Sequence, residues 1–312
     1  MEDLCITRPR SRLAWGIDYP SSKDHVVYVW FDALINYVSI AKYQSVKEKF
    51  GNVWPADIHM VGKDILRQHA VYWPIMLKAC GLEMPKRILA HGWWTLSGAK
   101  VSKSRGNVVD PVELVKKYGV DAFRYFLLNE VTIGNDGAFS EDLLAERYTT
   151  DLANNLGNLW FRFASMLEKY CTGAIPEWNL SDLRQDELGG LFVEVSQAVK
   201  GLDPRTALSA IFNTATRLNI YIENKKPWVL AKDTAQKKEL IHVLGTLGEW
   251  IAHIAVLLLP FLPLAAEHIL TRLKLSSGRF PNTEGDFKKP LLKAGTPVER
   301  GEALFPRLEE MK

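Results

Sequence analysis

Residues 26–137 alternate between short apolar runs and longer segments of helical periodicity. The continuous β-branched and aromatic run at 26–32 predicts a buried strand, and a helical pattern follows it to about residue 50. A second strand is predicted at 57–62, before a helix that Asp64 can cap and that ends near Gly81. Residues 87–91 predict a third strand. Because strands alternate with helices here, the pattern predicts a parallel sheet of α/β type.

Ligands bind beyond the carboxyl ends of the strands in sheets of this type. The three predicted strands end at Asp32, at Gly62-Lys63-Asp64 and at His91-Gly92-Trp93. We therefore expect these polar and glycine-containing segments to meet at one edge of the sheet.

The pattern changes near residue 137 and is helical from Ser140 onward. Ser140, with two acidic residues after it, is a typical helix start. Apolar residues then recur every three or four positions in a single stripe. The stripe comprises Leu144, Tyr148, Leu152, Leu156, Leu159, Phe163 and Leu167. Further helices are predicted at about 185–200, 205–224, 227–259 (with a break near Asp233) and 263–274, which together indicate a helical bundle.

These patterns divide the chain into four parts: an irregular start at 1–25, an α/β part at 26–137, a helical part at 138–275, and a Gly-, Pro- and charge-rich end at 276–312 expected to wrap the surface. The 312 residues are 47% hydrophobic and 24% charged, as in ordinary globular proteins. A net charge of +3 excludes a global basic field, so any nucleic-acid site must be local.

Cysteine usage and the most apolar stretch give weaker indications. The three cysteines are far apart and form no CxxC pair, which argues against a zinc knuckle and fits a reducing compartment. The apolar run at 251–264 is interrupted by Pro260 and Pro263 and predicts a buried helix.

The sequence Lys100-Val101-Ser102-Lys103-Ser104 places two lysines and two serines in a short loop behind a Gly-containing turn. Arg105-Gly106-Asn107 follows, and a helical pattern begins at Asp110-Pro111. Ammonium groups in such a loop can close around a polyphosphate. The alternative from these residues alone is a solvated basic turn.

An aromatic segment, Tyr28 to Tyr37, leads from the first predicted strand into a helix. The small Ala33 leaves room beside the rings of Trp30 and Tyr37, which could line a pocket for an unbranched side chain, although core packing explains the same pattern. In the next helix Ile65 and His69 share one face. There the simpler interpretation is that Asp64 caps the helix and His69 is a core residue.

Two features of the helical part suit RNA. Asn155, Asn158 and Arg162 lie on one helix face, where amide and guanidinium groups could read base edges. Trp228 follows Lys225-Lys226-Pro227 near a helix start, where a tryptophan could stack on an unpaired base. A solvated helix face and a partly buried tryptophan are the alternatives.

The lysine loop resembles that of class I aminoacyl-tRNA synthetases. Three segments resemble the methionyl-tRNA synthetase family in particular: Tyr28–Ala33, the Gly62–Ile65 turn with Trp73-Pro74 after it, and His91–Trp93 leading into Lys100–Ser104. The resemblance implies the second half of a Rossmann-like catalytic domain, followed by an α-helical anticodon-binding bundle.

The resemblance also implies residue roles. ATP would be bound as a substrate with Mg²⁺. Its pyrophosphate side would be stabilised by the loop residues Lys100, Ser102, Lys103 and Ser104. Methionine would be bound by seven residues: Trp30, Ala33, Leu34, Tyr37, Asp64, Ile65 and His69. Of these, Leu34 stands where one branch of the family has proline. Asn158, Arg162 and Trp228 would recognise the anticodon of tRNA(Met).

The chain departs from the family in two respects. It has no His-Ile-Gly-His-like loop of the first strand–helix unit and no zinc-bearing insertion, whose end resembles residues 1–25. We therefore expect a C-terminal half that binds no zinc and pairs with an N-terminal half. A truncated, non-catalytic tRNA- or nucleotide-binding relative and a synthetase for another aliphatic amino acid remain alternatives. The expected location is the cytoplasm, with the mitochondrion left open.

Overall fold

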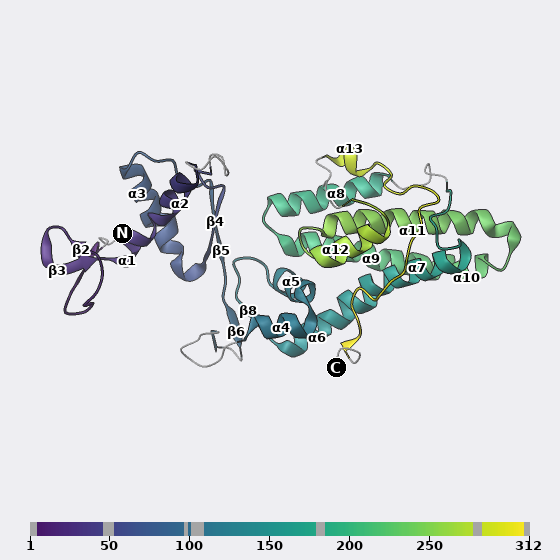
Figure 1. Ribbon diagram of the computed structural model, residues 1–312, viewed down its shortest axis with the longest axis horizontal. Helices are drawn as coiled ribbons and strands as arrows, with labels where there is room; N and C mark the ends of the chain where they lie inside the picture. Colours follow the sequence, from purple (N-terminus) through teal and green to yellow (C-terminus); the bar gives the residue numbers. More distant parts are fainter. Residues whose placement is uncertain are drawn as a thin grey trace. The chain divides into compact units, whose positions relative to one another are not determined.

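A computed structural model describes residues 5–45, 53–96, 99–100, 109–178, 185–276 and 283–308 (Figure 1). The chain forms two compact units. The first comprises Met1–Trp93 with Ile133–Asp136, and the second comprises Trp94–Thr132 with Gly137–Lys312.

The first unit begins with an antiparallel sheet in the order β1-β3-β2. Its strands are β1 (Thr7–Pro9), β2 (Asp18–Tyr19) and β3 (Ser22–Val27). The strand predicted at 26–32 is therefore wrong beyond Val27, since helix α1 (Val29–Ala33) follows at once. A continuous apolar run fits a strand or a helix equally well. Asp32 accordingly lies exposed in a helix and not at a strand end.

The predicted strands at 57–62 and 87–91 are confirmed as β4 (Ile58–Gly62) and β5 (Arg87–His91). They pair in parallel, with Ile58 opposite Arg87 and Gly62 opposite His91. Between them lie a 3-10 turn η1 (Lys63–Ile65), a π-helix η2 (Gln68–Tyr72) and helix α3 (Trp73–Ala79). Helix α2 (Asn36–Ser45) precedes β4.

The prediction that Asp64 caps the following helix is wrong. Gly62 is the residue that precedes the turn, and Asp64 lies inside η1. The Asp64 carboxylate instead accepts a hydrogen bond from the indole nitrogen of Trp93, at 3.3 Å. The turn therefore places this carboxylate at the end of the strand pair.

A small sheet and two helices open the second unit. Strand β6 (Trp94–Leu96) pairs antiparallel with β7 (Ala99–Lys100) and parallel with β8 (Gly137–Ala138). Helix α4 (Pro111–Tyr118) begins as predicted, with the Asp110 side chain accepting from the backbone N–H of Val112. Helix α5 (Val120–Asn129) follows.

The helix start at Ser140 is confirmed, because its hydroxyl accepts from the backbone N–H of Leu143. Helix α6 (Glu141–Arg147), π-helix η4 (Tyr148–Gly157) and α7 (Asn158–Tyr170) succeed one another without a break. Every member of the predicted apolar stripe is buried along them.

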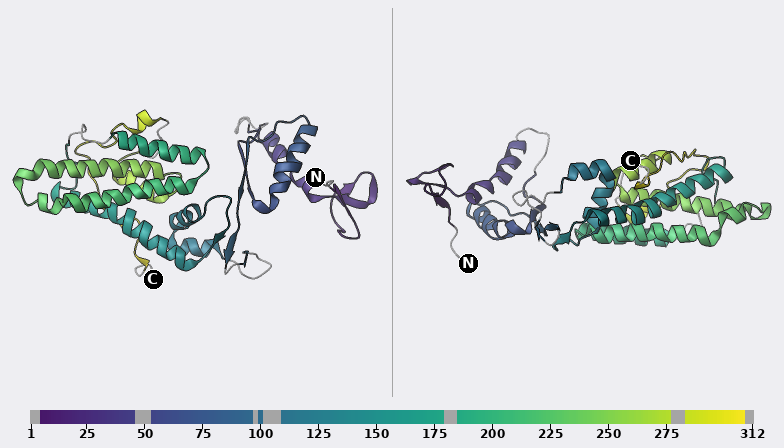
Figure 2. Two further views of the ribbon diagram at one scale, coloured as in Figure 1. Left: turned by 180° about the vertical axis from the view of Figure 1, so that it is seen from behind. Right: turned by 90° about the horizontal axis from the view of Figure 1, so that it is seen from below.

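The remaining predicted helices are confirmed, including the break at Asp233, whose carboxylate accepts from the backbone N–H of Ala235. They are α8 (Gln185–Lys200), α9 (Pro204–Lys225), α10 (Pro227–Leu230), η6 (Thr234–Gln236), α11 (Lys237–Leu258) and α12 (Pro263–Arg272). Helices α7, α9 and α11 lie side by side (Figures 1 and 2). Thr234–Leu258 has the length and hydropathy of a membrane span, but its apolar window is 83% buried, as expected of a core helix.

The described end of the chain is fixed to the bundle from α13 (Glu284–Phe287) onward. Phe287 and Leu292 are buried, so this segment does more than cover the surface. The fully buried Glu249 of α11 accepts from the backbone N–H groups of Leu291 and Leu292. His253, one turn later, contacts the Phe287 carbonyl oxygen at 2.6 Å.

The buried Glu249 carboxyl group makes the free energy of unfolding depend on pH. Burial raises the pKa of Glu249 to about 7, against the opposing effect of the two backbone amides. A carboxyl group with a raised folded-state pKa stabilises the fold fully below its unfolded pKa, and the stabilisation is lost as pH rises through about 7.

We therefore expect the unfolding free energy of the wild type to fall by roughly 3 kcal/mol relative to Glu249→Gln between about pH 4.5 and pH 8. Urea denaturation followed by circular dichroism at a series of pH values measures this difference. His253 Nδ1 lies 3.6 Å from the Glu249 carboxylate, so the two groups titrate as a coupled pair, and the difference between the two proteins measures the effect of the Glu249 charge on that pair. Parallel pH profiles would contradict the assignment.

Candidate functional site

Three aromatic side chains from separate segments of the first unit meet, with His69 between the other two. Trp30 comes from α1, Tyr37 from α2 and His69 from η2. The Tyr37 hydroxyl lies 2.9 Å from Nε2 of His69, and the Trp30 and His69 rings meet edge to face at 6.0 Å. His69 is only 1% exposed. The structure thus brings together residues whose predicted roles concern one pocket.

The hydrogen bonds of His69 fix its tautomer. Nδ1 lies 2.9 Å from the carbonyl oxygen of Ile65, which can only accept. Nδ1 therefore carries a hydrogen and donates it to Ile65, while Nε2 faces the Tyr37 hydroxyl. The two bonds fix the orientation of the imidazole and of the Tyr37 ring.

The apolar base of this group is Leu34, which is 1% exposed and lies in one buried cluster with Trp73 and Leu77. Trp30 and Tyr37 pack against that cluster. Ala33 and Ile65 are half-buried. The predicted methionine-binding roles of these residues stay predictions.

The ends of β4 and β5 hold a second, polar group. Lys63 pairs with Asp136 at 2.6 Å, and its ammonium lies 4.2 Å from the centre of the Trp93 ring. Asp136 also accepts from the backbone N–H of Trp93 at 2.8 Å, and the two contacts hold the pKa of Asp136 below its usual value. The predicted meeting of the two strand ends is confirmed, but Asp136 was not predicted, since it is far from them in sequence.

Close backbone approach requires glycine at position 92. A Cβ there would overlap the backbone of Asn135, just before Asp136. Gly92 is buried, so the overlap has no solvent side into which it could relax. The segment 133–136 is thereby held against the end of β5.

The described part of the lysine loop is its first residue. Lys100 belongs to β7, where it pairs with Thr95 of β6. Ser102, Lys103 and Ser104 lie outside the described residues. Helix α4, which follows the loop, is fixed by the Asp110 cap.

The predicted RNA-binding residues are partly brought together in the second unit. The Arg162 guanidinium of α7 lies 6.0 Å from the centre of the Trp228 ring and pairs with Glu223 of α9 at 2.7 Å. Trp228 is 37% exposed, and Asn158, one turn before Arg162, is also exposed. Glu223 was not predicted, because no local pattern marks it.

The prediction for Asn155 is wrong, because its side chain joins two helices. Its amide nitrogen donates to the Thr216 hydroxyl at 2.9 Å, and its amide oxygen accepts from Asn219 at 3.1 Å. These contacts to α9 explain an asparagine inside a helix without any role for RNA.

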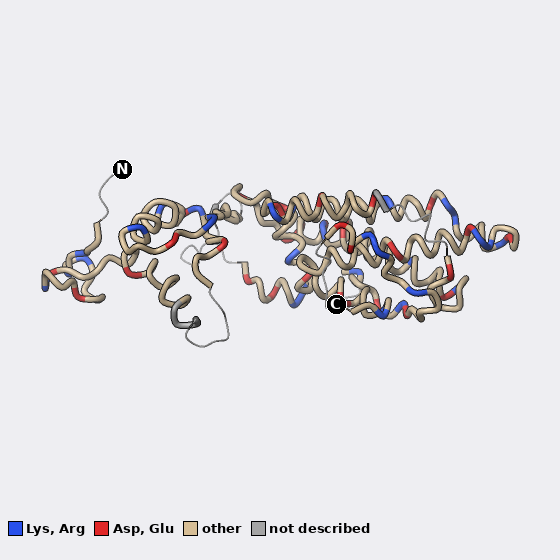
Figure 3. Tube along the Cα trace, turned by 90° about the horizontal axis from the view of Figure 1, so that it is seen from above, with Lys and Arg blue, Asp and Glu red and all other residues tan. Residues whose placement is uncertain are grey.

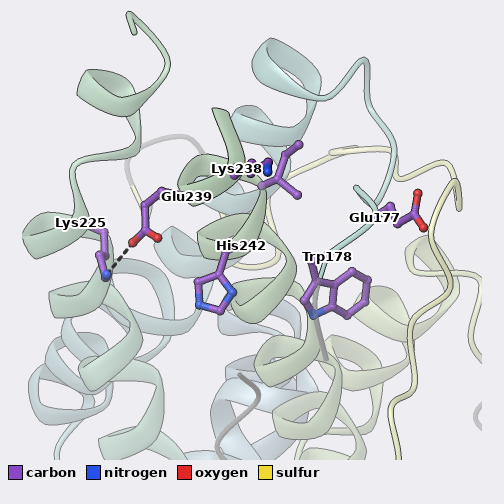
Figure 4. A pocket seen from close by; sticks show the side chains of 7 residues that line it. Glu177, Trp178, Lys225, Lys238, Glu239 and His242 are labelled. Carbon is purple, nitrogen blue, oxygen red and sulfur yellow. Dashed lines mark hydrogen bonds and ion pairs between the residues drawn. The ribbon is translucent and has the colours of Figure 1, made fainter. Parts of the chain in front are cut away.

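A cavity of about 490 Å³ lies where the C-terminal end of α9 meets the start of α11. Figure 4 shows the side chains that line it. The Trp178 ring packs closely on Gly245, and Lys225 pairs with Glu239 at 2.7 Å on the opposite wall. Lysines and carboxylates are interspersed here, as they are along the whole chain (Figure 3). In the described ranges no group of three or more His, Cys, Asp or Glu side chains is placed to hold a metal ion.

Comparisons with known proteins agree with this arrangement. Residues 1–164 match the family of class I tRNA synthetases (M), and residues 186–304 match the anticodon-binding domain of tRNA ligases. The methionine–tRNA ligase of Caldanaerobacter subterraneus is 44% identical over 100% of this chain and 49% of its own length. That of Bacillus subtilis is 41% identical over 99% and 47%. The chain spans about half the length of these relatives.

Solved structures are similar as well. Methionyl-tRNA synthetase of Mycobacterium tuberculosis in complex with methionyl-adenylate superposes with a TM-score of 0.87 at 38% identity, over 98% of this chain and 61% of that one. Its apo form gives a TM-score of 0.84 at 36% identity, over 98% and 60%.

The architecture is therefore that of a class I synthetase catalytic domain joined to a helical anticodon-binding domain. Within that class, the chain belongs to the methionine family of class I tRNA synthetases.

The close approach at Gly92 gives a prediction. Gly92→Ala should destabilise the first unit by about 1–3 kcal/mol, because the new methyl group must displace the backbone at Asn135. Hydrogen exchange of peptides covering 133–136 measures the effect as faster exchange.

A matched control is Gly190→Ala on α8, where a Cβ would meet nothing within 4 Å. It should be neutral or stabilise by about 0.5–1 kcal/mol, the usual gain for alanine in a helix. Equal exchange at 133–136 in Gly92→Ala and the wild type would refute the steric argument.

Proposed function

We propose that this chain supplies the second half of the catalytic domain and the anticodon-binding domain of an enzyme that activates methionine with ATP and transfers it to tRNA(Met). The observation that carries the proposal is the Tyr37–His69 hydrogen bond beside Trp30, in a chain of the methionine family. The relatives with bound methionyl-adenylate support the same chemistry.

The aromatic group suits a thioether side chain. Sulfur is a weak hydrogen-bond acceptor and interacts favourably with aromatic rings, by about 0.3–1.5 kcal/mol each. The walls of the proposed pocket are largely carbon, and the residues that provide them are Trp30, Ala33, Leu34, Tyr37 and Ile65. Asp64 lies at the rim, where its carboxylate can meet a polar part of the substrate.

Activation needs no proton transfer. The methionine carboxylate attacks the α-phosphorus of Mg²⁺-bound ATP, the bond to the bridging oxygen breaks, and pyrophosphate leaves. The enzyme must position the reactants and stabilise charge on the phosphate oxygens. Lys100 and Lys103, with the hydroxyls of Ser102 and Ser104, supply that stabilisation in the proposed mechanism.

The second unit provides a local RNA site. Trp228 offers a half-exposed ring for stacking, and Arg162 and Asn158 offer donors beside it. In the free protein Glu223 pairs with Arg162, so an anticodon base must compete with this carboxylate. A non-cognate loop that cannot replace this ion pair is disfavoured.

We also propose a partner, the N-terminal half of the catalytic domain. Among the residues that the structure describes, β4 and β5 form a parallel sheet of two strands, whereas parallel sheets are larger and covered on both faces. An apolar groove of about 370 Å³ is lined by residues of α1, α2 and α3, and Phe31, Ile35 and Ile75 are exposed on it. Further strands and helices would cover both features. The cytoplasm is the proposed location.

Complementation tests the proposal. Alone, the chain should show no methionine-dependent ATP–pyrophosphate exchange, and the N-terminal part of the Bacillus subtilis relative, added in trans, should restore it. Lys103→Ala should lower the restored rate by about two to three orders of magnitude, in line with the loss of other preorganised donors.

Three results would count against specific parts of the proposal. Exchange without a companion would refute the need for the partner. Exchange with leucine or isoleucine in preference to methionine would overturn the pocket assignment. No exchange with the companion, despite stable association, would favour a non-catalytic RNA-binding role.

A second prediction separates the two units. Trp228→Ala should weaken binding of an RNA hairpin carrying the methionine anticodon by about tenfold or more, since stacking contributes about 1–3 kcal/mol per base. Adenylate formation should change little. Fluorescence anisotropy measures RNA binding, and the control is Val229→Ala at the neighbouring exposed residue. Equal losses in both variants, or a parallel loss of adenylate formation, would refute this division of roles.

A further inference from the structure

A second buried histidine, His59, lies behind the proposed methionine pocket. It is 6% exposed, on β4, and no part of the proposed mechanism uses it. Its Nε2 accepts a hydrogen bond from the indole nitrogen of Trp73, at 3.2 Å. Its ring lies 4.4 Å from that of Tyr37.

Trp73 is the central ring beneath the pocket. It is 2% exposed, lies 6.0 Å from the Tyr37 ring and shares a buried cluster with Leu34. A tryptophan at this depth can rotate only if its indole N–H loses its partner, and burying that donor unpaired is unfavourable. The bond to His59 therefore holds the ring against which Leu34 and Tyr37 pack.

The bond requires a neutral His59. An imidazolium has hydrogens on both nitrogens and cannot accept from an indole. The titratable groups that face His59 are Tyr37 of α2 and His69 of η2, whose ring centre is 6.2 Å away. Burial, and secondarily the proximity of His69, lower the pKa of His59, so the accepting form dominates at neutral pH.

We propose that His59 is a positioning residue for methionine binding: its neutral Nε2 fixes the Trp73 indole, and through Trp73 it fixes Leu34 and Tyr37 in the orientation that receives the thioether. This inference rests on the proposed function. It assigns a role to a residue that touches no substrate and acts only through its neighbours.

The first test measures the hydrogen bond between the Trp73 indole and His59 directly. In the ¹⁵N-labelled chain, the indole N–H resonance of Trp73, assigned with Trp73→Phe, should exchange slowly at pH 7. His59→Phe keeps a ring but removes the acceptor, and should speed exchange at least about tenfold. His59→Gln, whose side-chain oxygen can occupy the Nε2 position, should restore slow exchange. Unchanged exchange in folded His59→Phe would overturn the proposal.

The second test measures how loss of the His59–Trp73 hydrogen bond changes methionine binding, and it uses the chain complemented with the N-terminal half. Michaelis constants for methionine in ATP–pyrophosphate exchange should rise about tenfold in His59→Phe, with a smaller change in kcat, and recover in His59→Gln. The wild-type constant should also rise as pH falls below the ordinary range of histidine, because protonated His59 cannot accept the indole hydrogen bond, and the rise should be smaller in His59→Gln. His25→Gln, in the β3 hairpin, is the control outside the pocket and should match the wild type.

The outcomes separate the two claims. A wild type that binds no methionine would overturn the proposed function, and this inference with it. A wild type that binds methionine, with an equal Michaelis constant in His59→Phe, would overturn the inference alone. Failure of His59→Gln to restore either readout while it remains folded would show that ring shape, and not the accepted hydrogen bond, matters, which also overturns the proposal.

Discussion

The parallel pairing of β4 with β5 is the constraint on which the candidate site depends. Its register sets Gly62 opposite His91, so the turn after one strand meets the loop after the other. The Lys63–Asp136 ion pair and the Trp93–Asp64 hydrogen bond close that meeting point. A shift of one residue would turn each side chain of β4 to the opposite face and remove His59 from Trp73. The polar rim and the aromatic pocket are therefore fixed by the same backbone contacts.

Buried polar groups in this chain join segments that hydrophobic packing alone would leave unordered. His59 holds an indole, Asn155 joins two helices, and Glu249 holds the end of the described chain on α11. Each is satisfied by named partners, and removal of one partner leaves a costly unpaired group. These hydrogen bonds add little buried surface, but they select one arrangement of the segments that they join.

The helical part could be predicted from sequence because its information is local. The stripe from Leu144 to Leu167, the helix start at Ser140 and the helix break near Asp233 depend only on nearby residues, and the structure has them as expected. The strand predicted to Asp32 failed because an apolar run does not distinguish strand from helix. Family resemblance, not periodicity, indicated that Trp30, Tyr37 and His69 belong together. Asp136, Glu223 and His59 could not be predicted, since their contacts come from distant segments.

The central claim is that the group around His69 receives the methionine side chain. A crystal structure of the chain with its companion half and methionyl-adenylate tests it most directly. The account predicts the thioether sulfur in van der Waals contact with Tyr37 and His69, and the phosphate toward the lysine loop. Clear density for the adenylate elsewhere, with the space beside Tyr37 empty, would contradict it.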